Sequence, residues 1–191
     1  MAAVPNLLGR RDYTRDEVRQ LDEAGLLPDR WELIDGEIIS RMGQNPPHAR
    51  TVDHVCMRLR QAFGNQRVKE ENPIEVAESD RLRNDPTLDV LVLAEDKAEY
   101  YDRHPRGDEL LIAIEVADTS VQFDRTKNRR LYARAEVPEY WVLDVPNRRL
   151  TVHINPENGD YLDIVELNEQ DTITTGDVQL LVAELLPKHS Q

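Results

Sequence analysis

Residues 110–117, LLIAIEVA, form an almost unbroken apolar run that carries one carboxylate, Glu115. A second run of the same kind, LDVLVLA at residues 88–94, carries Asp89. Continuous apolar runs of this length are typical of strands that are covered on both faces. We therefore predict an α/β fold in which these two runs lie inside a central sheet with helices packed on it.

The alternation of side chains along a strand places the two carboxylates. Glu115 shares its face with Ala113, and Asp89 shares its face with Leu91. If the two strands are neighbours, both carboxylates project to the same side of the sheet. Burying two carboxylates together is costly unless they are neutralised or hold a cation, and Mg²⁺ prefers such oxygen ligands. Alternatively, a lone glutamate in a strand is a sheet-edge or salt-bridge residue.

A lysine in the helix expected over residues 124–135 is a candidate third member of this site. One stripe of that helix is predicted to face the sheet, and its members are Phe123, Lys127, Leu131 and Ala135. An inward lysine beside two carboxylates can neutralise charge, orient a metal-bound water or stabilise a pentavalent phosphorane. Alternatively, the stem of Lys127 covers apolar surface while its ammonium reaches solvent. The residues alone leave both interpretations open.

The N-terminal part of the chain contains three strong local signals. A capping box at Thr14 and Glu17 predicts a first helix. The Asp35-Gly36 pair within WELIDGEIISRM predicts a β-hairpin with a tight turn. Apolar residues at helical spacing predict a longer helix that begins at His48 and stops at Gly64.

Further strands are expected at residues 68–77 and 140–145, and a C-terminal pair is expected to turn at Asn158-Gly159. The segment VQLLVAELL, residues 178–186, fits a helix or a strand. We predict one domain over residues 1–191. Its parts are an N-terminal helix and hairpin at 14–42, a core at 48–145 and C-terminal strands at 150–186.

Composition limits the function. The 191 residues carry a formal net charge of −13, whereas nonspecific nucleic-acid binding depends on basic surface. A phosphate-bearing substrate would therefore need a local basic patch, metal ions or both. No apolar run approaches the roughly 20 residues that cross a bilayer, and no secretory signal is visible. The single cysteine, Cys56, excludes an internal disulfide and is expected to be a buried apolar residue, so we expect a cytoplasmic protein with no membrane partner.

Several segments together resemble a known family. They occur in order between residues 14 and 155, and they are WELIDGEI, Pro-Pro-His48, LDVLVL, IEVADTS and FDRTKNRRLYARAEVPEYWVLD. They are similar to the Uma family, a bacterial group classed with the restriction endonucleases in the PD-(D/E)XK superfamily. The resemblance implies the restriction-endonuclease-like fold, a mixed central sheet flanked by helices. It also implies that Asp89 and Glu115 are the two acidic ligands for Mg²⁺ or Mn²⁺.

The sequence departs from the superfamily motif at two positions. Leu88 precedes Asp89 where a proline is expected, and Ala117 stands where the motif has its lysine. In the Uma-type variant that lysine is found in the following helix, which corresponds to Lys127.

Two more residues, Glu32 and His48, match family positions. Glu32 is either a third acidic ligand or a simple strand residue. His48 either lines the site or is a polar residue at a helix start. Asp118 and Asp124 are candidates for contacts behind the ligands or, for Asp124, a helix cap.

We therefore expect a metal-dependent endonuclease that hydrolyses DNA. Four arginines give either a local basic patch for DNA or an ordinary solvated helix face, and they are Arg125, Arg129, Arg130 and Arg134. Two alternatives are a non-catalytic interaction protein that retains the nuclease fold and a hydrolase of a smaller phosphodiester. Cutting both strands of a duplex needs two active sites or two visits, so a homodimer is a further expectation. The remaining histidines have no zinc-ligand spacing.

Overall fold

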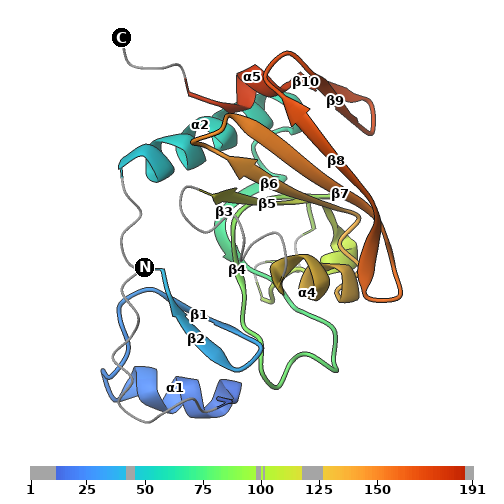
Figure 1. Ribbon diagram of the computed structural model, residues 1–191. Helices are drawn as coiled ribbons and strands as arrows, with labels where there is room; N and C mark the ends of the chain where they lie inside the picture. Colours follow the sequence, from blue (N-terminus) through green and yellow to red (C-terminus); the bar gives the residue numbers. More distant parts are fainter. Residues whose placement is uncertain (1–11, 42–45, 98–99, 101, 118–126, 188–191) are drawn as a thin grey trace.

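The computed structural model describes residues 12–41, 46–97, 100, 102–117 and 127–187. A six-stranded sheet in the order β3-β4-β5-β6-β7-β8 forms its centre (Figure 1). The strands are β3 (Val68–Pro73), β4 (Thr87–Leu93), β5 (Leu110–Ala117), β6 (Glu139–Asp144), β7 (Arg149–Glu157) and β8 (Asp160–Asn168). The β5–β6 pair is parallel and the other neighbours are antiparallel. The sheet is therefore mixed, as predicted.

The remaining elements surround this sheet. The helical segments are α1 (Arg15–Glu23), α2 (Pro46–Phe63), η2 (Gly107–Glu109), α4 (Arg129–Arg134) and α5 (Val182–Leu185). Two hairpins form separate two-stranded sheets, β1 (Trp31–Ile34) with β2 (Glu37–Ser40) and β9 (Thr172–Thr175) with β10 (Val178–Leu181). Helix α2 lies on one face of the central sheet and α4 on the other (Figure 1).

Strand alternation divides the interior into two apolar layers. On one side, Val90 and Ile114 pack with Leu59 of α2. On the other side, Leu91 packs in a cluster with Tyr132 of α4. The two predicted central strands are therefore covered on both faces, which confirms the interpretation of their continuous apolar runs.

The local signals at the N-terminus are confirmed. Thr14 and Glu17 form the capping box that starts α1. Asp35 and Gly36 have φ angles of 50° and 76°, the left-handed pair that a type I′ hairpin turn requires. Helix α2 begins at Pro46, two residues before the predicted start, because proline suits the first turn of a helix.

Other boundaries differ from the predictions. Strand β3 ends at Pro73 rather than at residue 77, because proline has no N–H with which to continue a ladder. Residues 178–186 are neither all helix nor all strand, since β10 passes directly into α5. The predicted start of the helix before Arg129 lies outside the described residues. Within the described part of the chain, no helix is long and apolar enough to cross a membrane.

Cys56 lies on the buried face of α2 and is 1% exposed. Burial raises the pKa of its thiol to about 12, which keeps the thiol protonated at neutral pH. It is a packing residue, as predicted.

Replacing a leucine inside the sheet should cost far more than replacing an exposed one. Leu143 on β6 is 1% exposed, whereas Leu162 on β8 is 63% exposed. We expect Leu143→Ala to lower the free energy of unfolding by about 2–5 kcal/mol, through lost burial and the cavity left behind. Leu162→Ala, the matched control, should change it by less than about 0.5 kcal/mol in the same urea titration. Equal losses would contradict the packing of β6 between two layers.

Candidate active site

The two predicted carboxylates lie on adjacent strands, just beyond the end of the β4–β5 ladder. Strands β4 and β5 are antiparallel neighbours, with Val90 opposite Ile114. Continuing that register by one residue puts Asp89 opposite Glu115, on the face that carries the α4-side cluster. Asp89 is 2% exposed and Glu115 is 6% exposed. The expected adjacency of the two strands is confirmed.

Both oxygens of Asp89 have protein partners. Oδ2 accepts a hydrogen bond from the backbone N–H of Val116 at 2.8 Å and lies 3.3 Å from Nε2 of His48. Oδ1 accepts a hydrogen bond from Nη2 of Arg41. Burial acts to raise the pKa of Asp89, but the His48 contact and the charge of Arg41 outweigh it and hold that pKa below its usual value. Asp89 is therefore an ionised, tightly held carboxylate.

Arg41 is a member of this site that the sequence analysis did not identify. It directly follows β2, and its guanidinium also donates to the carbonyl oxygen of Thr87 and lies 4.0 Å from Oε2 of Glu32. Burial acts to lower the pKa of Arg41, but the negative charges of Asp89, Glu115 and Glu32 raise it above its usual value. Because the partner residues are 48 positions apart, no local pattern could have indicated this contact.

Tyr132 holds the second carboxylate. Its hydroxyl donates to Oε1 of Glu115 at 2.9 Å, and its side chain is 0% exposed. Burial, together with the charges of Glu115 and Glu32, keeps the pKa of Tyr132 well above its usual value, so the hydroxyl remains a donor. Tyr132 was also missed, because it lies one position beyond the stripe that was predicted to face the sheet.

That stripe faces a different neighbour. Leu131 packs with Ile34 and Ile39 of the β1–β2 hairpin, and Nζ of Lys127 lies 2.9 Å from Oε2 of Glu37 on β2. The prediction that the stripe faces the sheet is therefore wrong for Leu131, although Ala135 does join the sheet-side cluster. Lys127 has a side chain that is 40% exposed, and its role in chemistry stays a prediction.

Glu32 and His48 both lie at this site. Glu32 belongs to β1 and is 8% exposed, with its carboxylate directed to Arg41. His48 belongs to the first turn of α2, from which its ring reaches Asp89. The structure thus gathers two strands of the sheet, the hairpin and the start of α2 around one buried carboxylate pair.

The predicted basic patch on α4 is compensated by carboxylates. Arg129 and Arg130 both pair with Asp160, and Arg134 pairs with Asp80 at 2.7 Å. The other predicted contributor, Arg125, lies outside the described residues, as do Phe123, Asp118 and Asp124.

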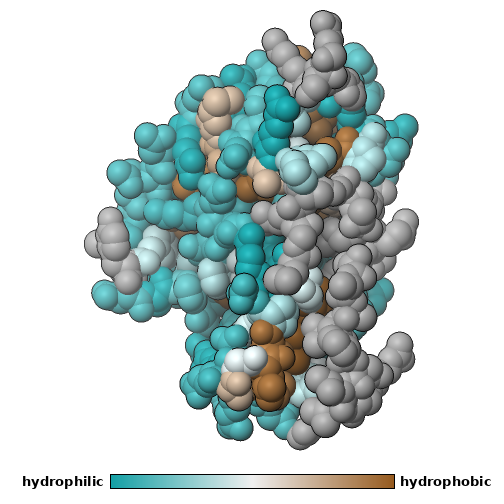
Figure 2. Space-filling model, turned by 90° about the vertical axis from the view of Figure 1, so that its left-hand side faces the viewer, coloured by the Kyte–Doolittle hydropathy of each residue, from teal (hydrophilic) through white to brown (hydrophobic). Residues whose placement is uncertain are grey.

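The molecular face seen from the left-hand side of Figure 1 is mostly hydrophilic, with a small apolar area low in the view (Figure 2).

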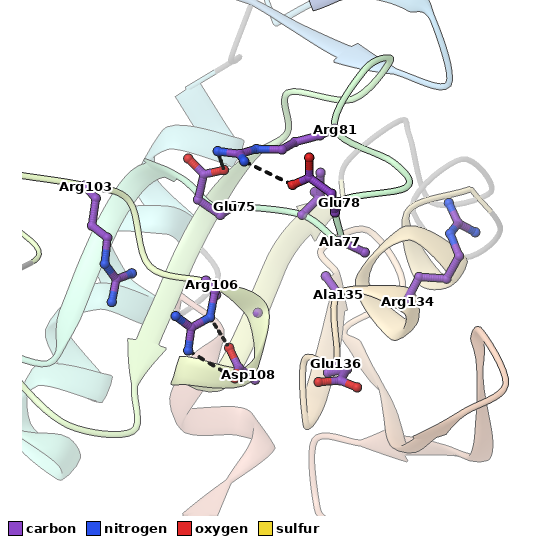
Figure 3. A pocket seen from close by; sticks show the side chains of 12 residues that line it. Glu75, Ala77, Glu78, Arg81, Arg103, Arg106, Asp108, Arg134, Ala135 and Glu136 are labelled. Carbon is purple, nitrogen blue, oxygen red and sulfur yellow. Dashed lines mark hydrogen bonds and ion pairs between the residues drawn. The ribbon is translucent and has the colours of Figure 1, made fainter.

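A separate pocket lies at the C-terminal end of α4 and has a volume of about 560 Å³. Within it, Arg81 pairs with Glu75 and Glu78, and Arg106 pairs with Asp108 (Figure 3). Its lining includes none of the five residues predicted for the active site. Since these arginines have carboxylate partners, the pocket is a charge-balanced surface hollow, distinct from the Asp89–Glu115 site.

A mixed central sheet between helices, with two buried carboxylates on adjacent central strands, is the arrangement expected of the restriction-endonuclease-like fold. Residues 16–183 match the Uma2 family, described as "Putative restriction endonuclease". This match spans most of the chain, and the protein belongs to that family. The resemblance noted from the sequence motifs is confirmed.

A solved structure has a similar fold. It is the crystal structure of "a putative nuclease belonging to DUF820" from Anabaena variabilis ATCC 29413. The two chains superpose with a TM-score of 0.63 and 16% sequence identity, over 86% of this chain and 96% of the other. At this identity the likeness establishes the fold. No curated protein matches the sequence.

The hydrogen bond from Tyr132 to Glu115 should stabilise the fold more than a similar bond to a neutral acceptor. We expect Tyr132→Phe to lower the free energy of unfolding by about 1.5–3 kcal/mol, the range for hydrogen bonds to charged groups. Tyr161 is the matched control, since it is 5% exposed and its hydroxyl donates to the carbonyl oxygen of Val137 at 2.8 Å.

Tyr161→Phe should cost only about 0.5–1.5 kcal/mol. Both variants are measured by urea denaturation in a buffer with a metal chelator, so that no bound ion contributes. A Tyr132→Phe loss no larger than that of Tyr161→Phe would show that Glu115 does not depend on this donor.

Proposed function

We propose that the protein is a metal-dependent endonuclease that hydrolyses phosphodiester bonds in DNA. The observation that best supports this is the pair of buried carboxylates, Asp89 and Glu115, on adjacent central strands. Carboxylates buried together are costly and persist where they serve a cation or a reaction. Membership of a nuclease family indicates which reaction that is.

The donor set suits Mg²⁺ or Mn²⁺. Among the described residues, no group of three or more His, Cys, Asp or Glu side chains is arranged to hold a metal ion. Mg²⁺ is usually held by one or two protein carboxylates, with waters and substrate phosphate oxygens completing its shell. Asp89 and Glu115 fit this requirement in kind and in number. A bound ion would supply a water of lowered pKa and a Lewis acid for the phosphate.

The surrounding residues orient the two ligands. The Val116 N–H fixes one oxygen of Asp89, and the Tyr132 hydroxyl fixes one oxygen of Glu115. His48 contacts the same Asp89 oxygen as Val116. Its ring therefore connects the first turn of α2 to this carboxylate. Such outer partners keep ligands in the geometry that a metal requires.

We assign Lys127 the contact with the substrate phosphate. Its ion-pair partner, Glu37, has a side chain that is 64% exposed, compared with 40% for Lys127. Ion pairs between exposed side chains contribute little free energy, so the ammonium can exchange Glu37 for a phosphate oxygen at small cost. In this proposal Lys127 offsets negative charge that develops on the phosphate.

A non-catalytic interaction protein is the second candidate. The net charge of −13 and the carboxylate partners of Arg129, Arg130 and Arg134 favour it, because both weaken attraction to DNA. Hydrolysis of a smaller phosphodiester is a related alternative that would not need an extended basic groove. A homodimer, which would present two sites to a duplex, is part of the endonuclease proposal.

The proposal is tested with purified protein, supercoiled plasmid, single-stranded DNA, RNA and bis(p-nitrophenyl) phosphate in millimolar Mg²⁺ or Mn²⁺. We expect Asp89→Asn and Glu115→Gln each to reduce plasmid cleavage by about 100-fold or more, because each removes a metal ligand. Glu109→Gln is the matched control. Glu109 is also buried, at 7% exposed, but it is bound by Arg103 at the far end of β5.

Each result distinguishes one proposal from another. Cleavage that survives both site substitutions would exclude this carboxylate pair as the active site. Hydrolysis of the small ester alone, dependent on Asp89 and Glu115, would support the smaller-substrate alternative. No hydrolysis of any substrate, with no Mn²⁺ binding by calorimetry, would favour the interaction protein.

Lys127 is tested against a neighbouring cation on the same segment. We expect Lys127→Ala to lower the cleavage rate by about tenfold or more, the range for loss of a charged group that stabilises a transition state. Arg130→Ala is the control, because Arg130 has a side chain that is 66% exposed and pairs with Asp160. Equal effects of the two variants on rate would assign Lys127 only a general charge effect.

A further inference from the structure

The buried end of the Arg41 side chain occupies a position that a metal ion would also need. Arg41 follows the hairpin strand β2, outside the central sheet, yet its guanidinium donates to Asp89 and to the carbonyl oxygen of Thr87. Its side chain is only 12% exposed. A guanidinium buried to this extent is found where it balances buried negative charge.

The charge around it is unequal. Among the described residues, three carboxylates lie around this one guanidinium, and they are Glu32, Asp89 and Glu115. All three are less than 10% exposed. When ionised, these three carboxylates exceed the single positive charge of Arg41, which is the condition under which a divalent cation competes with a monovalent one.

The two oxygens of Asp89 differ in how easily their partners can leave. Oδ2 is bound by the backbone N–H of Val116, which is fixed in the ladder of β5. Oδ1 is bound by a long side chain that comes from a separate two-stranded sheet. Coordination of a metal ion through Oδ1 is compatible with the Val116 bond, whereas a divalent cation on the oxygen that binds the guanidinium would be repelled by its positive charge.

We propose that Arg41 is the resident counter-cation of the Asp89–Glu115 site and that its guanidinium leaves Asp89 when a divalent cation binds. The inference rests on the proposed metal dependence and adds a residue that sets the affinity for the ion. Arg41 stabilises the folded protein when no metal is bound, because it balances the charge of the buried carboxylates. It also weakens metal binding, because its hydrogen bond to Asp89 must first break. It is a positioning residue rather than a ligand.

The first experiment measures Mn²⁺ binding by titration calorimetry in wild type, Arg41→Met and Arg15→Met. Arg15 is the matched control, because it also reaches from the N-terminal segment to a loop before β4, where it pairs with Asp85 at 2.5 Å and is 15% exposed. We expect Arg41→Met to bind Mn²⁺ about tenfold or more tightly than wild type, within the usual range of coupling between two binding events. Arg15→Met should bind Mn²⁺ as wild type does.

Thermal unfolding supplies a readout that does not depend on catalysis. Without metal, Arg41→Met should unfold at a lower temperature than wild type, because three buried carboxylates lose their cation. Saturating Mn²⁺ should raise its unfolding temperature by more than it raises that of wild type or Arg15→Met. A metal-induced rise equal to that of wild type would overturn the proposal.

A wild-type measurement covers the case in which Arg41→Met does not fold. The side-chain Nε–Hε resonance of Arg41, assigned with Arg41→Lys, is followed by NMR as Mg²⁺ is added, with the Arg15 resonance as reference. We expect the Arg41 signal to shift on metal addition and the Arg15 signal to stay in place. An unmoved Arg41 signal at saturating Mg²⁺ would overturn the proposal.

Failure of this inference differs from failure of the proposed function. If wild type binds Mn²⁺ and Asp89→Asn does not, while Arg41→Met binds no more tightly than wild type, the metal site stands and the role of Arg41 is wrong. If neither wild type nor Arg41→Met binds Mn²⁺, metal dependence itself is wrong and the inference fails with it.

Discussion

The burial of two carboxylates on adjacent strands of the sheet is the constraint on which the arrangement of the other elements depends. An ionised carboxylate away from water is unfavourable by several kcal/mol unless donors and positive charge surround it. Here the surrounding groups are the Val116 N–H of β5 itself, the Tyr132 hydroxyl of α4, the guanidinium that follows β2 and the His48 ring at the start of α2. The contacts from outside this strand pair therefore help to hold α4, the hairpin and the start of α2 against β4 and β5. The contacts that stabilise the buried carboxylates are thus the same contacts that hold the flanking elements on the sheet.

The β1–β2 hairpin shows the consequence most clearly. A two-stranded hairpin is marginally stable alone, and this one pairs with no strand of the central sheet. Its attachments include the backbone bridge between Leu33 and Asp85, apolar contact of Ile34 and Ile39 with Leu131, and the bonds of Arg41. The third attachment is electrostatic and ends on a predicted metal ligand. A change of charge at Asp89 would therefore change how strongly Arg41 holds the hairpin, whereas the apolar contacts do not depend on that charge.

The parts of the structure that could be predicted from the sequence are those set by local periodicity. The apolar runs of β4 and β5, with one carboxylate each, were enough to place Asp89 and Glu115 on one face. The helical stripe that joins Lys127 and Leu131 was also correct as a stripe, since both residues meet the hairpin. Its target was wrong, because periodicity tells which residues share a face and not which element lies opposite. Arg41 and Tyr132 could not be found in this way, because their contacts join distant segments and follow no period.

For the binding of a phosphate, the local charge at the Asp89–Glu115 site matters more than the net charge of the whole chain. In the metal-free state three carboxylates, Glu32, Asp89 and Glu115, lie around the one guanidinium of Arg41, and ionised carboxylates in this excess would repel a phosphate. On this proposal, a divalent cation at Asp89 would add two positive charges, while Arg41 would stay nearby and keep the charge that it already contributes. On this proposal, a chain with a net charge of −13 would admit a phosphodiester at this one point without a basic groove. In this proposal metal binding precedes substrate binding, because the ion that would replace the guanidinium at Asp89 would also cancel the local negative charge that a phosphate otherwise meets.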